Sequence, residues 1–303
     1  MNPLPTVVGL GEILWDLLPS GRQLGGAPAN FAYWSHVLGS RAVVASRVGD
    51  DELGREICHF LLARGLTNQF LQTDSAHPTG TVRVQVDSSG QPRFEFTDAV
   101  AWDSLESSPS WRTLAESANA VCFGSLAQRS AVSRETIQKF LDYTHPDALR
   151  IFDVNLRQSF YSEEIIVKSA QRANVIKLNH EEMPVIRELL EIKAEDSFSF
   201  CTQMSVKFGL RLICLTRGTN GSLLSDGKHT HEHPGFQVVV QDTVGSGDAF
   251  TAALVHAYLC GRPLPEMNDA ANRLGAWVAS CHGAMPAMPV EGLEKNLARL
   301  QLH

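Results

Sequence analysis

Short, continuously apolar runs alternate with helical patterns along most of this chain, and this alternation constrains the fold more than any other feature. The runs are rich in β-branched residues, which is typical of strands buried on both faces of a parallel sheet. Between them, apolar residues recur every three or four positions, as on one face of an amphipathic helix. We therefore predict an α/β fold, a mostly parallel sheet covered by helices on both faces. The predicted strands are residues 6–10, 42–46, 120–124, 149–153, 174–178 and 211–216, and the predicted helices are residues 27–38, 51–64, 133–144, 163–172, 181–190 and 197–208.

Two stretches do not follow this alternation. Residues 80–96 alternate between apolar and polar positions on both sides of a turn at residues 87–91, which predicts a β-hairpin with one face in water. Residues 13–23 are too long for a simple turn between a strand and a helix. We predict a small antiparallel β-flap made of residues 12–24 and 79–103, which would act as a lid where ligands bind. The alternative is an edge extension with no function of its own.

The composition is that of a globular protein with a large core, because 44% of the 303 residues are hydrophobic and 19% are charged. A net charge of −7 argues against binding to nucleic acid or to an anionic membrane. No apolar run approaches the roughly 20 residues that span a bilayer, and residues 1–10 lack the basic region of a signal peptide. The six cysteines are scattered without a C-x-x-C pair, which favours buried, reduced thiols. We expect a cytoplasmic protein, with one domain over residues 1–303 and no membrane or nucleic-acid partner.

The most informative stretch is DTVGSGDAF at residues 242–250, which precedes an apolar helical pattern. Gly245, Ser246 and Gly247 would lie at the start of this helix, where unpaired N–H groups and the helix dipole favour an anion. Asp248 would follow in the first turn. A carboxylate there repels a bound phosphate, but it suits a general base that takes a proton from an attacking hydroxyl. The residues alone leave open a second interpretation, in which the aspartate caps the helix and the glycines only form the turn.

Two other nucleotide-binding patterns are absent from the sequence. The chain has no G-x-x-x-x-G-K-[ST] motif, which excludes a P-loop enzyme. Gly9 and Gly11 are not followed by the third glycine of the dinucleotide fingerprint. A dehydrogenase that uses a nicotinamide cofactor is therefore disfavoured, despite the predicted sheet.

The ordered motifs resemble those of the PfkB, or ribokinase-like, carbohydrate kinases. DTVGSGDAF is similar to the second signature of that family, and GGAPANFA at residues 25–32 with RVGDDELG at residues 47–54 is similar to the first. KLNHEE at residues 177–182 resembles the N-x-x-E element, and TRGTNG at residues 216–221 resembles the nucleotide loop. The motifs occur in family order over nearly the whole chain, which makes the resemblance highly specific.

Within the family, the chain looks most like the bacterial fructokinases. The motifs that suggest this are GGAPANFA, DVNLR at residues 153–157 and AWD at residues 101–103. The resemblance implies a ribokinase-like fold and transfer of the γ-phosphate of ATP to a sugar hydroxyl. Asp248 would be the base, and the amides of Gly245, Ser246 and Gly247 would hold the charge that develops on the transferred phosphoryl group.

The resemblance also implies which residues would bind ATP and Mg²⁺. Asn179 and Glu182 would orient water-bound Mg²⁺ near the phosphates. Without the resemblance, an ordinary strand-to-helix cap is the better interpretation of these two residues. The implied nucleotide-binding residues are Asn179, Thr216, Gly218, Gly221 and Asn272, although a lone helix asparagine such as the last is more often a surface residue.

For the sugar, the resemblance implies Asp16 as the acceptor of two hydroxyl groups, with Gly26 and Asn30 in the same pocket and Arg157 close by. The implied substrate is D-fructose, which would become fructose 6-phosphate. Arg157 leaves an alternative open, because it could instead bind the carboxylate of a sugar acid such as 2-keto-3-deoxygluconate. A non-catalytic sugar-binding regulator on the same fold is a further alternative, but binding alone requires no base at Asp248.

Two further groups of side chains allow two interpretations each. Trp102 and Phe96 would either stack on a sugar face or pack within the flap. His229, His231 and His233 would share one strand face, where an exposed hairpin is favoured over a zinc site.

The resemblance further points to potassium, held by carbonyls of residues 242–244 and 280–287, although Ala287 lacks the hydroxyl found in many relatives.

Val82, Val84 and Val86 would lie on one face of the predicted hairpin. A hairpin cannot bury both faces on the sheet of one monomer, and an exposed apolar face with free strand edges favours association. Flaps of this kind often pair across a two-fold axis in the family. We therefore expect a homodimer formed through the β-flap.

Overall fold

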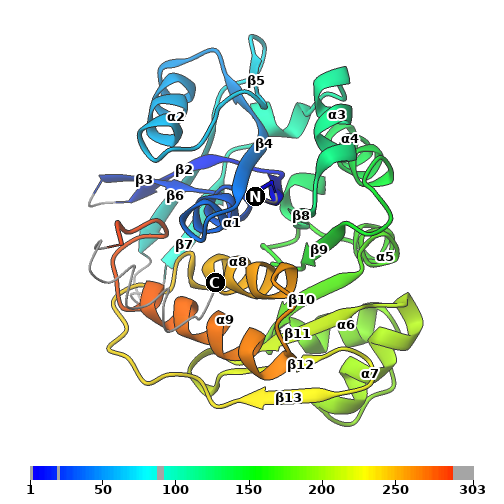
Figure 1. Cartoon of the computed structure of the whole chain (residues 1–303). Helices are drawn as coiled ribbons and strands as arrows, with labels where there is room; N and C mark the ends of the chain where they lie inside the picture. The colour runs from blue at the N-terminus through cyan, green and yellow to red at the C-terminus, as the bar shows by residue number, and fades with distance from the viewer. Residues whose placement is uncertain (1–2, 19–20, 87–91, 289–303) are drawn as a thin grey trace.

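The computed structural model describes residues 3–18, 21–86 and 92–288, and of residues 84–94 it describes no side chain. It shows a nine-stranded sheet with helices on both faces and a four-stranded sheet beside it (Figure 1). All six predicted strands are present in the large sheet. They are β1 (Thr6–Leu10), β4 (Arg41–Gly49), β8 (Ala120–Phe123), β9 (Leu149–Asp153), β10 (Val175–Asn179) and β11 (Leu212–Thr216).

The large sheet has the strand order β13-β12-β11-β10-β9-β8-β1-β4-β5. Pairing is parallel from β11 through to β5, as predicted. β5 (Leu71–Asp74) and β12 (Ser222–Ser225) were not predicted, whereas β13 (Thr230–His233) belongs to the exposed hairpin expected for the alternating histidines. β12 and β13 pair antiparallel at one edge of the sheet. The sequences LQTD, SLLS and THEH contain at most two apolar residues each, so none of these strands forms a continuous apolar run.

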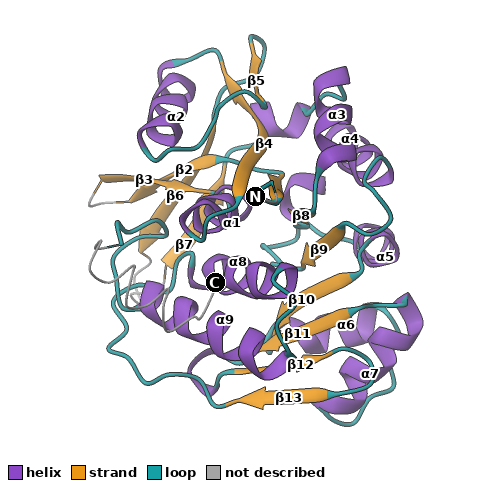
Figure 2. Cartoon of the chain, viewed as in Figure 1, coloured by secondary structure: helices purple, strands orange, loops and turns teal. Residues whose placement is uncertain are grey.

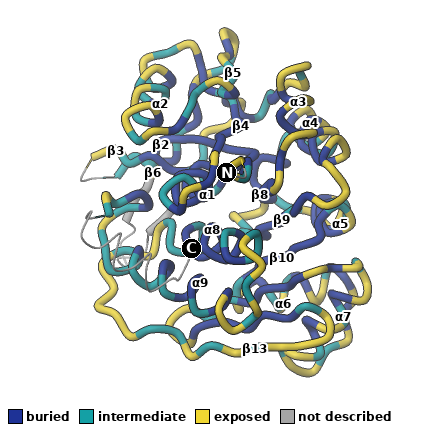
Figure 3. Tube along the Cα trace, in the orientation of Figure 1, coloured by how far each residue is buried: buried dark blue, intermediate teal, exposed yellow. Residues whose placement is uncertain are grey.

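Each face of the large sheet has its own apolar core, because neighbouring side chains on a strand point to opposite faces. Val7 of β1 packs in one core and Val8 in the other. Helices cover both faces, and the strands from β12 to β4 are almost wholly buried, whereas the edge strands β13 and β5 are not (Figures 2 and 3). The first core includes α1 (Ala27–Val37), α2 (Glu52–Ala63), α8 (Ser246–Leu259) and α9 (Leu264–Ala279), and the second includes α3 (Pro109–Ser117), α4 (Ala131–Asp142), α5 (Glu163–Arg172), α6 (Glu182–Leu189) and α7 (Ser197–Phe208).

The two stretches that break the alternation together form the four-stranded lid sheet, in the order β3-β2-β6-β7. β2 (Leu14–Leu18) with β3 (Gly21–Gly25), and β6 (Gly80–Val86) with β7 (Pro92–Phe96), are antiparallel pairs. The two pairs join through a parallel pairing of β2 with β6, so the flap is not antiparallel throughout. Val82 is buried, with 1% of its surface exposed. The turn at residues 87–91 and the side chains of Val84 and Val86 lie outside the described residues.

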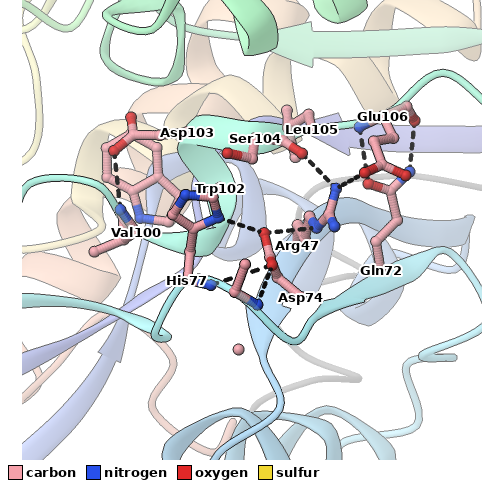
Figure 4. A network of polar contacts seen from close by, with 12 residues as sticks. Arg47, Gln72, Asp74, His77, Val100, Trp102, Asp103, Ser104, Leu105 and Glu106 are labelled. Carbon is pink, nitrogen blue, oxygen red and sulfur yellow. Dashed lines mark hydrogen bonds and ion pairs between the residues drawn. The ribbon is translucent and has the colours of Figure 1, made fainter.

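The lid sheet is fastened to the large sheet at the carboxyl end of β4. Asp51, which caps α2, accepts hydrogen bonds from the N–H and the hydroxyl of Thr79, at 2.8 and 2.6 Å, just before β6. Arg47 on β4 reaches Asp74 at 3.1 Å and donates a hydrogen bond to the carbonyl of Ser104 at 2.6 Å, beyond the end of β7 (Figure 4). The RVGDDELG motif therefore holds the β6–β7 hairpin at both of its ends.

Trp102 packs inside the protein, because only 1% of its surface is exposed and the guanidinium of Arg129 lies 4.2 Å from its ring centroid. Phe96 packs edge-on against Phe160, with 5.6 Å between the ring centroids. These contacts favour packing over sugar stacking for both aromatic residues.

All six cysteines are free thiols. Cys122, Cys201 and Cys214 are buried as expected, and burial raises the pKa of each. Cys260 is exposed instead, because it follows the last residue of α8, where the helix ends at the surface. In the part of the chain that the structure describes, no helix is long and apolar enough to cross a membrane.

Candidate active site

Predicted catalytic and binding residues lie at the carboxyl ends of the parallel strands. In the sheet, β1 has β4 on one side and β8 on the other. The direction in which successive strands are added therefore reverses between β1 and β8. Such a reversal opens the crevice where α/β proteins bind ligands. A small cavity of about 10 Å³ marks this place, and its lining includes Pro28, Gly124, Asp153 and Asp248.

α8 begins at Gly245, whose φ of 76° lies in the left-handed region that favours glycine. A Cβ atom here would lie 2.6 Å from Cα of Ala284, so no larger residue fits. The N–H and the hydroxyl of Ser246 both donate to the carbonyl of Thr243, at 3.3 and 2.9 Å. Gly247 follows in the first turn, where N–H groups have no partner within the helix. The helix start predicted for the anion site therefore has the expected glycine geometry, with the amide of Ser246 engaged by a long hydrogen bond.

The carboxylate of Asp248 faces α1 and the sheet. Its Oδ2 accepts a hydrogen bond of 2.7 Å from Nδ2 of Asn30. Burial raises the pKa of Asp248 to about 6 and the carboxylate of Asp153 adds to the rise, while Asn30, Lys177 and Arg157 oppose it. A group with this pKa is ionised at neutral pH and still basic enough to accept a proton.

The residues predicted for the sugar lie on β2, at the start of α1 and in the loop after β9. Burial raises the pKa of Asp16 to about 6, and the charge of Arg157 opposes the rise. Arg157 is exposed and lowers the pKa of Asp248 as well, so one cation serves carboxylates from β2 and α8. Gly26, with a φ of 105°, precedes α1, and a Cβ atom on it would lie 2.5 Å from the carbonyl oxygen of Glu12. Asn30 thus contacts Asp248 directly, Gly26 immediately precedes the helix that carries Asn30, and the charge of Arg157 acts on both Asp16 and Asp248.

The predicted nucleotide loop follows β11. Thr216 is the last residue of this strand and lies opposite Asn179 in the sheet. Gly218 and Gly221 have φ values of 57° and 75°, which favour glycine in the turn. A Cβ atom on Gly221 would also overlap the carbonyl oxygen of His233.

Asn272 lies on α9 and is buried, so it is not the surface residue that an isolated helix asparagine suggests. Its Nδ2 donates a hydrogen bond of 2.7 Å to the hydroxyl of Ser222, at the start of β12. This bond ties α9 to the strand that follows the nucleotide loop.

Asn179 and Glu182 form the strand-to-helix cap between β10 and α6. Oδ1 of Asn179 accepts from the N–H of Glu182, and Oε2 of Glu182 accepts from the N–H of Asn179, both at 2.8 Å. Oε1 of Glu182 accepts from the N–H of Leu156 at 2.8 Å. Because these oxygens already accept hydrogen bonds from backbone donors, the two residues fit contact with Mg²⁺ through water better than direct ligation. No group of three or more His, Cys, Asp or Glu among the described residues is placed to hold a metal.

The two segments predicted for potassium lie together. Oδ2 of Asp242 accepts a hydrogen bond from the N–H of Gly283 at 3.0 Å, and the N–H of Gln241 donates to the carbonyl of Ala279 at 2.9 Å. The two segments therefore lie side by side just before the start of α8.

The three histidines have separate partners rather than a common site. His229 pairs with Asp226 at 3.3 Å, whereas His231 contacts Asn268 at 3.2 Å and His233 contacts Asp269 at 3.5 Å. Only His229 is exposed, so the expected exposed hairpin is correct in part.

A larger cavity of about 230 Å³ lies outside the crevice, between α9 and residues 236–238. Arg273 and Trp277 line it, but none of the predicted site residues does. The size of this cavity does not by itself indicate a chemical function, so the crevice at Asp248 remains the candidate active site.

Comparison with known proteins decides the family. The family model described as "pfkB family carbohydrate kinase" matches residues 21–291. The chain belongs to this family. It is 30% identical to a fructokinase of Escherichia coli over 299 residues, which cover 92% of this chain and 95% of that protein. It is 28% identical to a putative sugar kinase of Pyrococcus horikoshii, over 92% of this chain and 91% of that protein.

Solved structures confirm the ribokinase-like fold of this PfkB carbohydrate kinase. The sugar kinase of Pyrococcus horikoshii in complex with ATP has a TM-score of 0.82 and 27% identity, over 98% of this chain and 100% of that chain. A fructokinase of Vibrio cholerae O395, with fructose, ADP and calcium bound, has a TM-score of 0.81 and 25% identity, over 97% of this chain and 99% of that chain.

One buried ion pair in this PfkB kinase was not predicted from the sequence. Nζ of Lys177 lies 3.0 and 3.1 Å from the two carboxylate oxygens of Asp153, below the first turn of α8. Both residues belong to family motifs, Asp153 to DVNLR and Lys177 to KLNHEE. A lysine inside an apolar strand was the available signal, because a buried lysine almost always has a partner of opposite charge.

The sequence analysis also missed Glu12, which follows β1 and is only 2% exposed. Its Oε2 has no hydrogen-bond partner within the described protein. Burial raises the pKa of Glu12 from 4.5 to about 7; Asp248 adds to the rise, and Arg157 opposes it. A glutamate directly after a buried strand and Gly11 was the signal for a carboxyl group at the crevice.

We expect Glu12→Gln to remove a pH-dependent loss of stability. The folded protein binds one more proton than the unfolded chain between pH 4.5 and about 7, so ionisation of Glu12 destabilises the fold as the pH rises through this window. Relative to wild type, the variant should gain up to about 3 kcal/mol between pH 4.5 and 8. Urea unfolding at several pH values measures this gain. Glu163→Gln, at an exposed position, is the matched control; the same gain in both variants would contradict the expectation.

Proposed function

We propose that this carbohydrate kinase transfers the γ-phosphate of ATP to the primary 6-hydroxyl of D-fructose and releases fructose 6-phosphate and ADP. The single observation that carries the proposal is the 2.7 Å hydrogen bond between Asn30 and Asp248. It joins the GGAPANFA helix, proposed for the sugar, to the carboxylate proposed as the base. The fructokinases at 30% identity support fructose as the substrate.

In this mechanism, Asp248 accepts the proton of the sugar hydroxyl as its oxygen attacks the γ-phosphorus atom. The amides of Gly245, Ser246 and Gly247, at the N-terminus of α8, stabilise the negative charge on the transferred phosphoryl group. Mg²⁺, when bound, neutralises charge on the nucleotide phosphates, and Asn179 and Glu182 would orient its water ligands.

Substrate binding is assigned to both sides of the crevice. Asp16 would accept hydrogen bonds from two sugar hydroxyls, which requires its ionised form, present above pH 6. Gly26 and Asn30 would line the same pocket, and Arg157 would position a hydroxyl or a phosphate. The proposed nucleotide-binding residues are Asn179, Thr216, Gly218, Gly221 and Asn272.

The exposed Arg157 favours one second candidate, a sugar acid such as 2-keto-3-deoxygluconate, whose carboxylate it would bind. A coupled ADP-release assay over a panel of sugars and sugar acids separates the two. Fructose should give the highest kcat/KM, and thermal shifts should appear with ATP–Mg²⁺ and with fructose but not with NAD. A higher kcat/KM for the sugar acid than for fructose would make the sugar acid the substrate. Binding of fructose without ADP release would favour a non-catalytic regulator.

We also propose that the chain works in the cytoplasm as one kinase domain over residues 1–303, with potassium as an activating ion. The segments that would supply carbonyls to potassium are joined by the hydrogen bond between Asp242 and Gly283. Dialysis into sodium buffer should then lower turnover, and potassium should restore it.

We further propose that two copies of the chain form a homodimer through the β-flap. β3 and β7 lie at the two edges of the lid sheet, and free strand edges favour association. Val84→Lys should weaken dimerisation and raise KM for sugar more than KM for ATP. Sedimentation velocity measures the first effect and the kinase assay measures the second. A wild-type monomer at micromolar concentration, with an unchanged KM for sugar in the variant, would contradict the dimer.

A further inference from the structure

The buried ion pair contacts the helix that carries Asp248. Lys177 on β10 is 6% exposed, and its Nζ binds Asp153 at the end of β9 at 3.0 Å. A Cβ atom on Gly247 would lie 3.1 Å from this Nζ, so the ammonium group lies directly against the first turn of α8. Thr251, one turn further along α8, donates a hydrogen bond to Asp153 at 3.3 Å. Both members of the pair therefore contact α8.

We propose that Lys177 is a positioning residue for the transfer step: held by Asp153, its ammonium group supports the first turn of α8 and keeps Asp248 ionised beside the phosphoryl group. This inference rests on the proposed kinase function. Burial lowers the pKa of Lys177, but the carboxylates of Asp153, Glu182 and Asp248 outweigh burial and raise it above its ordinary value. Lys177 is therefore a permanent positive charge under the anion site.

Charges of both signs act on Asp248. The carboxylate of Asp153 favours its protonated form, whereas Lys177 favours its ionised form. Because Arg157 is exposed and screened by water, Lys177 is the buried cation of this set. Removing Lys177 leaves buried carboxyl groups together without that cation, so Asp248 should keep its proton to higher pH. The titratable and charged groups that act on Asp248 are Asp153 on β9, Lys177 on β10, Arg157 after β9, Glu12 after β1 and Cys122 on β8.

Three variants distinguish this role from a merely structural one. Lys177→Met should raise the pKa of Asp248 by about one unit, and Asp153→Asn should lower it. The double variant should return towards the wild-type value, because it removes both charges. It also avoids an unpaired buried charge, so it provides a folded protein if Lys177→Met alone does not fold.

The pKa of Asp248 is measured by ¹³C NMR of its carboxyl carbon in the unliganded protein, with Asp248→Asn to assign the resonance. The low-pH limb of kcat for sugar phosphorylation should move in the same direction in each variant. Lys168→Met, which removes an exposed lysine paired with Glu164 on α5, is the matched control.

A pKa of Asp248 that is unchanged in Lys177→Met, or shifts of the same sign in Lys177→Met and Asp153→Asn, would overturn the inference. If Lys177→Met does not fold, an Asp248 pKa in the double variant equal to that in Asp153→Asn would overturn it. The NMR titration needs no substrate. The expected shifts in a protein that phosphorylates no sugar would therefore overturn the proposed function and leave the electrostatic role of Lys177 standing.

Discussion

Asp248→Asn should reduce kcat for sugar phosphorylation by roughly 10²–10⁴-fold, with ATP binding largely retained. The substitution keeps the shape of the side chain and its capacity to accept the hydrogen bond from Asn30. It removes the group that takes the proton from the sugar hydroxyl. A coupled ADP-release assay at saturating ATP and sugar measures turnover, and calorimetry with ATP–Mg²⁺ measures nucleotide binding.

The pH dependence provides the control for this variant. Wild-type turnover should increase as the pH rises through about 6, where Asp248 ionises, and the residual activity of the variant should lack this limb. Because the folded pKa lies above the ordinary 3.8, ionisation of Asp248 destabilises the fold between these two values. Asp248→Asn should therefore be at least as stable as wild type at pH 8. Near-normal turnover would show that Asp248 is not the base.

Gly247→Val should lower kcat/KM on the order of 10²–10³-fold or more, while the protein stays folded. A valine here would cover the first turn of α8 and keep the phosphoryl group away from the backbone amides. Its Cβ would also lie 3.1 Å from Nζ of Lys177, closer than an ordinary contact, and would push the lysine away from Asp153. The ADP-release assay gives the loss of activity, and circular dichroism with thermal unfolding shows whether the fold is intact.

Two further glycine variants are matched to this one. Gly247→Ala adds only the Cβ atom, so its loss of activity should be smaller than that of valine. Gly245→Ala should instead destabilise the fold, because its φ of 76° and the backbone of Ala284 exclude a side chain. In this turn, a side chain would therefore strain the backbone at Gly245, whereas at Gly247 the restriction is only the space available for a side chain. A folded, fully active Gly247→Val protein would show that this glycine serves only the helix start.

The large sheet and its helices could be predicted because each of their patterns is local. A strand such as β1 is buried on both faces, so its five residues TVVGL are all apolar or small after the first. The helix starts were equally readable, as when Asp51 accepts the N–H of Gly54 and begins α2. The edge strand β12 was not predicted, because SLLS has only two apolar residues and forms no continuous apolar run. β13, which has no buried residue, was expected only as part of an exposed hairpin.

The lid sheet was predicted only in its pieces. The β6–β7 hairpin follows from its own alternation, whereas β2 and β3 were expected only as an undivided segment of the flap. The parallel pairing of β2 with β6 joins segments far apart in the sequence. No local pattern encodes that register. The same limit applies to Trp102, whose burial under Arg129 depends on how the segment after β7 packs against the core.

The sequence by itself determined which chemical groups the kinase has and their order: the glycines and Asp248 at the start of α8, the GGAPANFA helix and the loop at Thr216. Only the tertiary structure decided their charge states. Asp248 and Glu12 have raised pKa values because folding removes water from them and brings other carboxylates near them. Lys177 stays charged because β9 and β10 place it against Asp153. Coulomb energies and desolvation depend on distance and burial in space, and residues distant in the sequence acquire these only when the chain is folded.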